Sequence, residues 1–256
     1  MKLDELQANW DKFGATDPLW GILAWPDKSE NRWQIDEFFA TGVAEIDGVL
    51  AYVEGLGLPL RRGAALDFGC GVGRLSQALA GRFQTVVGVD ISPAMIELAG
   101  RYNRFPDRCH YRLNARDDLS LFEGGRFDFI YSNITLQHMQ PRYSRAYMAE
   151  FLRLLAPGGV LVFQIPSRGK RWQQNVLQPL KPTRLFRFYQ RLRYGDRPIM
   201  SMYGTEKTRV LAWLGQHRGR VVDVQPDDSA DSQWYSFRYC VVKEPDAPAL
   251  QDLKGR

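Results

Sequence analysis

The glycine-rich stretch Ala64–Leu75 carries the residues with the clearest chemistry in the chain. A short apolar run leads into Asp67, and glycines follow at every second position, Gly69, Gly71 and Gly73. Glycines let the backbone turn tightly and let a ligand approach it with no Cβ in the way. A helix after such a turn directs its free N–H groups toward that ligand. The stretch therefore predicts a turn that binds a nucleotide-like cofactor.

The spacing of the glycines separates this turn from a dinucleotide-binding turn. In the dinucleotide pattern G-x-G-x-x-G the third glycine would fall at Arg74, but the chain has Gly73 instead. Farther along, residues 84–90 have the pattern of a second strand that ends in the acidic residue Asp90. A carboxylate at that place can accept both hydroxyls of a ribose. These features predict a nucleoside cofactor, and Arg74 disfavours a nicotinamide-dependent oxidoreductase.

On these motifs the chain resembles the class I S-adenosylmethionine-dependent methyltransferases, from Ala64 to about Pro166 and more loosely in its last strands. The resemblance implies S-adenosyl-L-methionine as cofactor and S-adenosyl-L-homocysteine as product, with Asp90 on the ribose and Ile91 beside the adenine. Asn114 stands where the family commonly has an Asp that faces the adenine amine, and its carbonyl oxygen could accept the same hydrogen bond. The implied cofactor-binding residues are Asp67, Gly69, Cys70, Gly71, Gly73, Asp90, Ile91, Met95, Asn114, Ala115, Arg116 and Ser132.

His138 is the candidate catalytic residue. It follows the predicted fourth strand in a loop where related methyltransferases place active-site residues. An imidazole with a near-neutral pKa could remove the proton of an attacking hydroxyl. The alternative is a histidine that hydrogen-bonds the backbone and shapes the loop. The other two histidines suit other roles, because His110 lies in a predicted strand and His217 at a helix C-terminus.

The sequence after the predicted fourth strand narrows the methyl acceptor. Many relatives that methylate nucleic-acid bases or amides carry Asn/Asp-Pro-Pro-aromatic there, whereas residues 132–135 read Ser-Asn-Ile-Thr. No acidic cluster follows, which disfavours the metal-dependent catechol enzymes, and no metal site is predicted. We expect O-methylation of a small molecule or a sugar hydroxyl, with a glycan or glycolipid precursor preferred. The alternatives are N- or C-methylation of a small metabolite, and a protein that binds the cofactor without catalysis.

Strands and helices alternate around these motifs, which predicts an α/β fold with a Rossmann-like, doubly wound, mostly parallel seven-stranded sheet. The predicted strands begin at Ala64, Gln84, Cys109, Phe127, within 155–163, and at Gly219 and Trp234. The predicted helices cover 35–56, 73–82, 93–103, 142–155 and 205–217. Ser92 is the expected N-cap of the helix that begins at Pro93.

The chain divides into five predicted parts. They are a Trp-rich N-terminal helical cap (1–60), the cofactor-binding core (61–166), a basic lid or insertion after strand five (167–202), a completion of the core (203–243) and a flexible tail (244–256). Trp10 and Trp20 are the candidates to cover the cofactor, although aromatic residues in such a lead-in often serve only in packing.

Basic residues concentrate in the insertion. Residues 168–197 contain nine basic residues and one acidic residue, within a chain of net charge +5. A helix at 184–194 would place Leu185, Phe188, Tyr189 and Leu192 on one side and Arg184, Arg187 and Arg191 on another. One interpretation is contact with an anionic membrane or a lipid-linked substrate. The other is a lid whose apolar side packs on the domain and whose arginines face water.

The bulk composition agrees with a globular enzyme. The chain has 256 residues, 45% of them hydrophobic, and no apolar run near the roughly 18 residues of a membrane span. Three scattered cysteines predict no disulfide framework, and the acidic N-terminus has no signal-peptide core. We therefore expect a cytoplasmic protein, peripheral to the inner membrane face if the basic segment contacts lipid, with a small-molecule partner, no nucleic acid and an undetermined oligomeric state.

Overall fold

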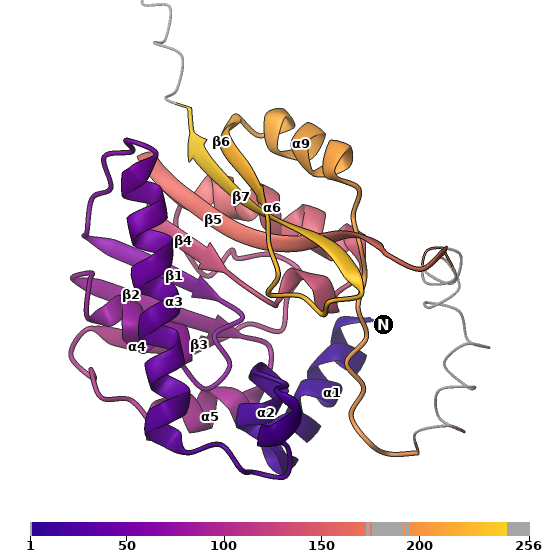
Figure 1. Cartoon of the computed structure of the whole chain (residues 1–256). Coiled ribbons are helices and arrows are strands. Elements are labelled where there is room, and N and C mark those ends of the chain that lie inside the picture. The colour runs from indigo at the N-terminus through magenta and orange to yellow at the C-terminus, as the bar shows by residue number, and fades with distance from the viewer. Residues whose placement is uncertain (1, 173–174, 176–191, 193–194, 245–256) are drawn as a thin grey trace, which may run out of the picture.

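A computed structural model describes residues 2–172, 175, 192 and 195–244, and shows a central sheet with helices packed on it (Figure 1). The sheet has seven strands in the order β3-β2-β1-β4-β5-β7-β6. The first five strands pair in parallel, and β7 is antiparallel to both β5 and β6. The strands are β1 (Ala64–Phe68), β2 (Thr85–Asp90), β3 (Cys109–Leu113), β4 (Phe127–Ser132), β5 (Leu155–Gly169), β6 (Gly219–Pro226) and β7 (Trp234–Lys243).

Helices cover both faces of the sheet. They are α1 (Leu3–Thr16), α2 (Pro18–Ile22), α3 (Ile35–Gly55), α4 (Arg74–Ala80), α5 (Pro93–Arg101), α6 (Pro141–Leu154) and α9 (Lys207–Gln216), with short 3-10 turns η1 (Pro26–Lys28) and η2 (Leu136–His138). Side chains of α3 and α4 share one core cluster with the sheet, and side chains of α6 and α9 share another. The described residues thus form the predicted doubly wound α/β arrangement.

The alternation of side chains along β4 shows why both faces are buried. Phe129 belongs to the cluster on the α3 and α4 side, and the next residue, Ile130, belongs to the cluster on the α6 and α9 side. Successive strand residues point to opposite faces, so a central parallel strand needs apolar residues at almost every position. Both side chains are fully buried.

Most predicted elements agree with the structure to within two or three residues, and the differences lie at the ends and in the N-terminal region. Ser92 caps α5 as expected, because its hydroxyl accepts the Met95 N–H at 3.2 Å. β5 continues to Gly169, into the stretch assigned to the insertion, because β7 pairs with it that far. Helices α1 and α2 lie in the region expected to form a helical cap, although their bounds were not predicted. The proposed basic helix at 184–194 lies outside the described residues except for Leu192.

The order of the strands locates a crevice. The chain moves outward from β1 to β2 and β3, and then returns to place β4 on the other side of β1. The loops after β1 and β4 therefore diverge at the carboxyl ends of the strands, where open α/β sheets bind their ligands.

Candidate functional site

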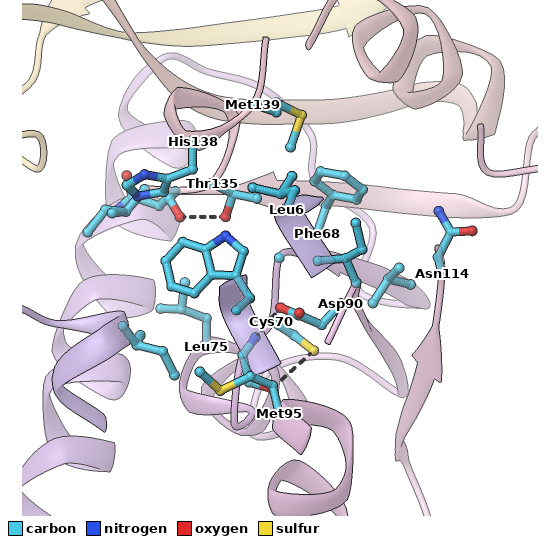
Figure 2. A pocket seen from close by; sticks show the side chains of 18 of the residues that line it. Leu6, Phe68, Cys70, Leu75, Asp90, Met95, Asn114, Thr135, His138 and Met139 are labelled. Carbon is cyan, nitrogen blue, oxygen red and sulfur yellow. Dashed lines mark hydrogen bonds between the residues drawn. The ribbon is translucent and has the colours of Figure 1, made fainter. Parts of the chain in front are cut away.

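A pocket lies at this crevice, with about 880 Å³ of space between atoms, part of it open to solvent (Figure 2). Its walls come from the loop after β1, the end of β2, the residue after β3, the loop after β4, and α1. The residues from the loop after β1 and from β2 include Gly69, Cys70, Gly71, Asp90 and Ile91. Five segments that are distant in sequence therefore meet at one place.

The glycine turn is tight enough that larger residues would not fit. Gly69 has φ +80° and Gly71 has φ +51°, in the left-handed region that glycine adopts without strain. A Cβ added at Gly69 would lie 2.2 Å from the Thr135 side chain, and one at Gly71 would lie 2.5 Å from Ile22 Cδ1. The turn therefore needs glycine for its backbone conformation and for its packing.

Asp90 is held by the turn that it faces. Its Oδ2 accepts the Gly71 N–H at 2.9 Å, and its Oδ1 accepts the Ser92 N–H at 2.9 Å. Burial raises the pKa of this carboxyl, and the two amide hydrogen bonds oppose that rise. A carboxylate can accept about four hydrogen bonds. Two acceptor positions thus remain for a ligand with neighbouring hydroxyls.

Asn114 follows β3 and also lines the pocket. Its side-chain nitrogen donates to the Asp118 carbonyl oxygen at 2.8 Å, and its backbone N–H donates to the Asp90 carbonyl at 2.9 Å. The nitrogen is therefore directed at the loop, and the carbonyl oxygen is the atom that could accept a hydrogen bond from an amine. This arrangement agrees with the role expected from the sequence.

His138 lies in η2 and lines the same pocket. Its Nδ1 lies 3.0 Å from the Ser201 carbonyl oxygen, and its Nε2 lies 3.3 Å from Gln137 Nε2. Burial lowers the pKa of the imidazole to about 4, because a charged ring would lose its hydration. The near-neutral pKa expected from the sequence is therefore wrong, and the ring is neutral throughout the physiological pH range.

Helix α1 closes one side of the pocket. Leu3, Leu6 and Trp10 contribute to its wall, and the Trp10 ring meets the His138 ring edge-on with centroids 5.1 Å apart. Of the two tryptophans expected to cover the cofactor, Trp10 faces the pocket. Trp20 does not line it, and its indole N–H donates to the Trp25 carbonyl oxygen at 3.1 Å.

Asp67 lies beneath the glycine turn and does not line the pocket. Its Oδ2 accepts the Ser76 hydroxyl at 2.6 Å, and its other oxygen has no hydrogen-bond partner among the described residues. Burial raises the pKa of this carboxyl to about 7. The Asp67 side chain therefore links the end of β1 to α4 through Ser76.

Four other residues expected at the cofactor also lie outside the pocket wall. Gly73 caps α4, Ala115 and Arg116 are exposed, and the Ser132 hydroxyl donates to the Phe68 carbonyl oxygen at 3.0 Å. The expected residues that the structure brings together at the pocket are Gly69, Cys70, Gly71, Asp90, Ile91, Met95, Asn114 and His138.

Sequence reasoning missed several residues of the wall, among them Leu3, Leu6, Asn133 and Tyr147. A signal existed for the first two, because positions 3, 6 and 10 fall on one face of a helix. Asn133 and Tyr147 gave no such signal, since their place depends on how the loop after β4 and α6 fold over the sheet.

A polar network around Glu45 includes two residues of the pocket wall, Arg74 and Asn133. Glu45 accepts hydrogen bonds from Tyr131 at 2.9 Å, Asn133 at 2.7 Å and Arg74 at 2.8 Å. Within the described part of the chain, Arg74 Nε and Asn133 Oδ1 are buried without a partner. Both residues line the pocket. One unpaired donor and one unpaired acceptor are therefore available near a ligand, and buried polar atoms rarely stay unpaired.

The described residues contain no group of three or more His, Cys, Asp or Glu side chains that could hold a metal ion. None of the described helices is both long and apolar enough to cross a bilayer.

Comparison with known proteins identifies the domain. Residues 65–159, which contain the glycine turn, Asp90 and His138, match the profile of a methyltransferase domain. These residues form a class I S-adenosylmethionine-dependent methyltransferase domain. The resemblance seen in the sequence is confirmed.

Two curated relatives give further context. A ubiquinone biosynthesis O-methyltransferase of Xanthomonas campestris is 29% identical over 163 residues, which is 63% of this chain and 62% of the relative. An uncharacterised methyltransferase of Synechocystis is 31% identical over 107 residues, 42% of this chain and 49% of the relative. The chain thus spans about half to three fifths of the length of these relatives.

The fold agrees with solved methyltransferases. The magnesium protoporphyrin IX methyltransferase of Synechocystis with bound S-adenosylhomocysteine superposes with a TM-score of 0.57 at 19% identity, over 91% of this chain and 97% of that one. The same enzyme has also been solved with S-adenosylmethionine. S-adenosylmethionine is therefore the cofactor of this domain family, and a glycine cradle beside a carboxylate with free acceptor positions fits it.

Proposed function

We propose that the protein is an S-adenosylmethionine-dependent O-methyltransferase that acts on a hydroxyl of a small molecule. The observation that carries the proposal is that Asp90, the glycine turn and the neutral imidazole of His138 line one pocket. A cofactor site and a proton acceptor are thus within reach of one bound acceptor. The name of the Xanthomonas campestris relative, an O-methyltransferase, supports the same reaction type.

In this proposal the chain holds the cofactor at three places. Asp90 accepts the ribose hydroxyls with its two remaining acceptor positions, and the Asn114 carbonyl oxygen accepts from the adenine amine. Asn133 Oδ1 and Arg74 Nε, the unpaired buried atoms, would pair with the ammonium and the carboxylate of the methionine part. When bound, the cofactor supplies a methyl group on a positively charged sulfur.

The chain's contribution to the reaction is mainly orientation, exclusion of water and removal of one proton. The bound cofactor would supply the methyl group and its sulfur would keep the electron pair of the broken carbon–sulfur bond, while Nε2 of His138 would take the proton that the acceptor hydroxyl loses. Helix α1 covers the pocket through Leu3, Leu6 and Trp10, which limits the access of water. Placing the reacting groups together can itself lower the barrier by several kcal/mol, about 7–11 in favourable cases.

The wall around His138 favours an acceptor with an apolar framework. The Trp10 ring contacts the His138 ring, Met139 follows His138 in the chain, and Ile22 and Ile134 are further apolar residues of the pocket wall. Burial of an apolar ring against them contributes about 25 cal/mol per Å² of surface removed from water. A sugar or glycan acceptor, preferred on the sequence, would need hydrogen-bond partners in addition to stacking on Trp10. We therefore infer a hydroxyl on an apolar or aromatic molecule, with a sugar as the second candidate.

The first test is transfer of a tritiated methyl group from S-adenosylmethionine to fractionated cell extract. The proposal expects a labelled small molecule whose label sits on oxygen. Label on nitrogen or carbon would contradict O-methylation, and tight cofactor binding with no transfer to any fraction would indicate a non-catalytic binding protein.

The second test separates the roles of His138 and the cofactor site. We expect His138→Ala to lower turnover by about 100-fold, in the range for loss of a general base, while cofactor affinity changes by less than about threefold. Exposed His110→Ala is the matched control and should leave both quantities unchanged. Equal losses of turnover and affinity in His138→Ala would contradict the base role.

A further inference from the structure

A chain of buried polar side chains links the sheet to His138. Gln164, in β5, accepts the Ile134 N–H with its Oε1 at 3.2 Å and donates from its Nε2 to Gln137 Oε1 at 3.2 Å. Gln137 Nε2 lies 3.3 Å from His138 Nε2, and His138 Nδ1 lies 3.0 Å from the Ser201 carbonyl oxygen. Both glutamine side chains are buried.

The backbone N–H of Ile134 fixes the orientation of the side-chain amides of Gln164 and Gln137. The Ile134 N–H can only donate, so the oxygen of Gln164 faces it and the NH₂ of Gln164 faces the oxygen of Gln137. The NH₂ group of Gln137 must then face His138. A donor at 3.3 Å requires that Nε2 of the imidazole carries a lone pair and no hydrogen.

The backbone carbonyl of Ser201, which contacts the other ring nitrogen, requires the same tautomer of His138. The Ser201 carbonyl can only accept, so Nδ1 of His138 must carry a hydrogen. The Ile134 N–H and the Ser201 carbonyl, which are far apart in sequence, therefore require the same state of the His138 ring: neutral, with its hydrogen on Nδ1. An imidazolium would set a second donor against the NH₂ group of Gln137.

The same glutamines hold the loop after β4 in a strained conformation. Ile134 has φ +55°, which is unfavourable for a β-branched residue and costs about 1–3 kcal/mol. Its N–H is bound by Gln164, and the backbone carbonyl of Gln137 accepts the Tyr203 N–H at 2.7 Å. Gln164 also donates to the Ser236 hydroxyl at 2.5 Å, which fixes it against β7. Strain of this kind is typical of functional sites.

We propose that Gln137 and Gln164 are positioning residues that hold His138 in the Nδ1–H tautomer and present Nε2 as the proton acceptor of the methyl-transfer reaction. The inference rests on the proposed function, because the proton comes from the acceptor hydroxyl. In the structure the lone pair of Nε2 faces the NH₂ group of Gln137, so the proposal requires the acceptor hydroxyl to displace that group before the proton is transferred.

Burial is the largest influence on the pKa of His138, and Gln137 is the side chain that the structure places in hydrogen-bond contact with its Nε2. Of the residues that line the pocket with His138, the other ionisable ones are Cys70, Arg74, Asp90 and Tyr147. The hydrogen bonds that the structure gives to the imidazole come from Gln137 and the Ser201 carbonyl, and α1 contributes the edge of Trp10. A change in the group at position 137 should therefore move the pKa of His138.

The test is a nitrogen-15 NMR titration of the full chain labelled at histidine, which has three histidines. His110→Gln and His217→Gln variants assign the signals by elimination. At pH 7 the wild-type protein should show His138 with its hydrogen on Nδ1 and no imidazolium. A hydrogen on Nε2, or a charged ring at pH 7, would overturn the proposal without the need for any variant.

Two variants then test the role of Gln137. Gln137→Met removes the donor and should raise the pKa of His138 by about one unit, and Gln137→Glu places a carboxylate there and should raise it by about one to three units. Exposed Gln84→Glu is the control and should leave it unchanged. Equal pKa values in all four proteins would overturn the positioning role. The titration needs no substrate and therefore tests the state of His138 independently of the reaction. If His138 has the predicted tautomer but the protein transfers no methyl group, the proposed function is refuted, and only the effect of Gln137 and Gln164 on the tautomer is supported.

Discussion

At the scale of single residues, burial shifts the pKa of two ionisable groups in opposite directions: His138, which lines the pocket, and Asp67, which lies outside its wall. Burial lowers the pKa of His138 to about 4 and raises the pKa of Asp67 to about 7. In both cases the neutral form is favoured, because a charged form would lose its hydration. The pocket therefore holds a neutral imidazole, and Asp67, outside the pocket wall, is a carboxyl that is partly protonated near neutral pH.

The low pKa of His138 predicts the pH dependence of turnover. A base must be unprotonated to act, and this one is unprotonated well below neutrality. We expect no fall in kcat/KM attributable to His138 between pH 8 and about pH 5, and a fall only as pH approaches 4. The measurement is the rate profile with the acceptor that the labelling assay identifies. An inflection near pH 6.5 that disappears in His138→Ala would contradict this account.

Asp67 predicts a pH-dependent stability. Its folded-state pKa is raised, so its contribution to stability is fully present below pH 3.8 and is lost as pH rises through about 7. Asp67→Asn keeps an acceptor for Ser76 and removes the charge. We expect the variant to unfold in urea with a free energy about 1–3 kcal/mol above wild type at pH 8, and with a smaller gain at pH 5.

The control for this measurement is Asp228→Asn, which changes an exposed carboxyl. It should change stability by less than about 0.5 kcal/mol at either pH. If Asp67→Asn is destabilised equally at both pH values, the carboxyl of Asp67 is ionised and paired in a way that the present account does not include.

At the scale of elements, α1 forms hydrogen bonds with two other segments of the chain, the start of α5 and the backbone at Ile199. On one side Asp11 Oδ1 accepts the Ser92 hydroxyl at 2.5 Å and the Ala94 N–H at 3.3 Å, at the start of α5. On the other side Asn9 exchanges hydrogen bonds with the backbone of Ile199, at 3.1 and 2.8 Å. Because α1 also forms a wall of the pocket, we expect its attachment to influence how fast ligands enter and leave.

Loss of the Asp11 contact should loosen α1. Asp11→Ala removes a cap-like interaction that contributes about 0.5–2 kcal/mol. We expect faster proteolysis within the first 20 or so residues and a several-fold faster release of S-adenosylhomocysteine, measured by stopped-flow fluorescence of the tryptophans. Asp4→Ala, an exposed carboxyl of the same helix, should change neither. An unchanged release rate in Asp11→Ala would show that α1 does not gate the pocket.

The elements also show which parts of the site the sequence could reveal. The loop after β1 and the acid at the end of β2 were predictable, because their chemistry depends on local spacing: glycines that allow a turn, and a strand that ends in a carboxylate. A helical cap was expected over residues 1–60, but the bounds of α1 were not predicted, although Leu3, Leu6 and Trp10 have helical spacing. The role of α1 depends on docking against α5, which Gly14 permits, since a Cβ there would lie 2.8 Å from Ala94 Cβ.

The pKa of His138 shows a second limit of sequence reasoning. A histidine after the fourth strand was a reasonable candidate, but its burial and its partners come from β5, η2 and the segment around Ser201. Local sequence gives an ordinary pKa near 6.5, and only the assembled loop gives a value near 4. The same reason explains why Ser132 and Asp67 were expected at the cofactor and instead support the loop from within.

At the scale of the whole molecule, the sheet order brings the separate motifs to one crevice. Residues 65–159 supply the turn, Asp90, Asn114 and His138, and α1 and the segment 196–203 close over them. Any ligand that binds this closed form and not the unfolded chain should stabilise the protein by mass action, about 2.7 kcal/mol at a concentration 100 times its Kd. Ligand binding at this one pocket should therefore raise the free energy of unfolding of the protein.

The most direct test of the central claim is calorimetric titration of S-adenosylhomocysteine into wild-type protein and into Asp90→Ala. Asp90 would form two charge-assisted hydrogen bonds to the ribose, each of about 1.5–3 kcal/mol, so its loss should weaken binding by at least about 100-fold. Glu97→Gln, an exposed carboxyl on α5, is the control and should bind like wild type. Equal affinity of Asp90→Ala and wild type would contradict the assignment of this pocket to the adenosyl cofactor.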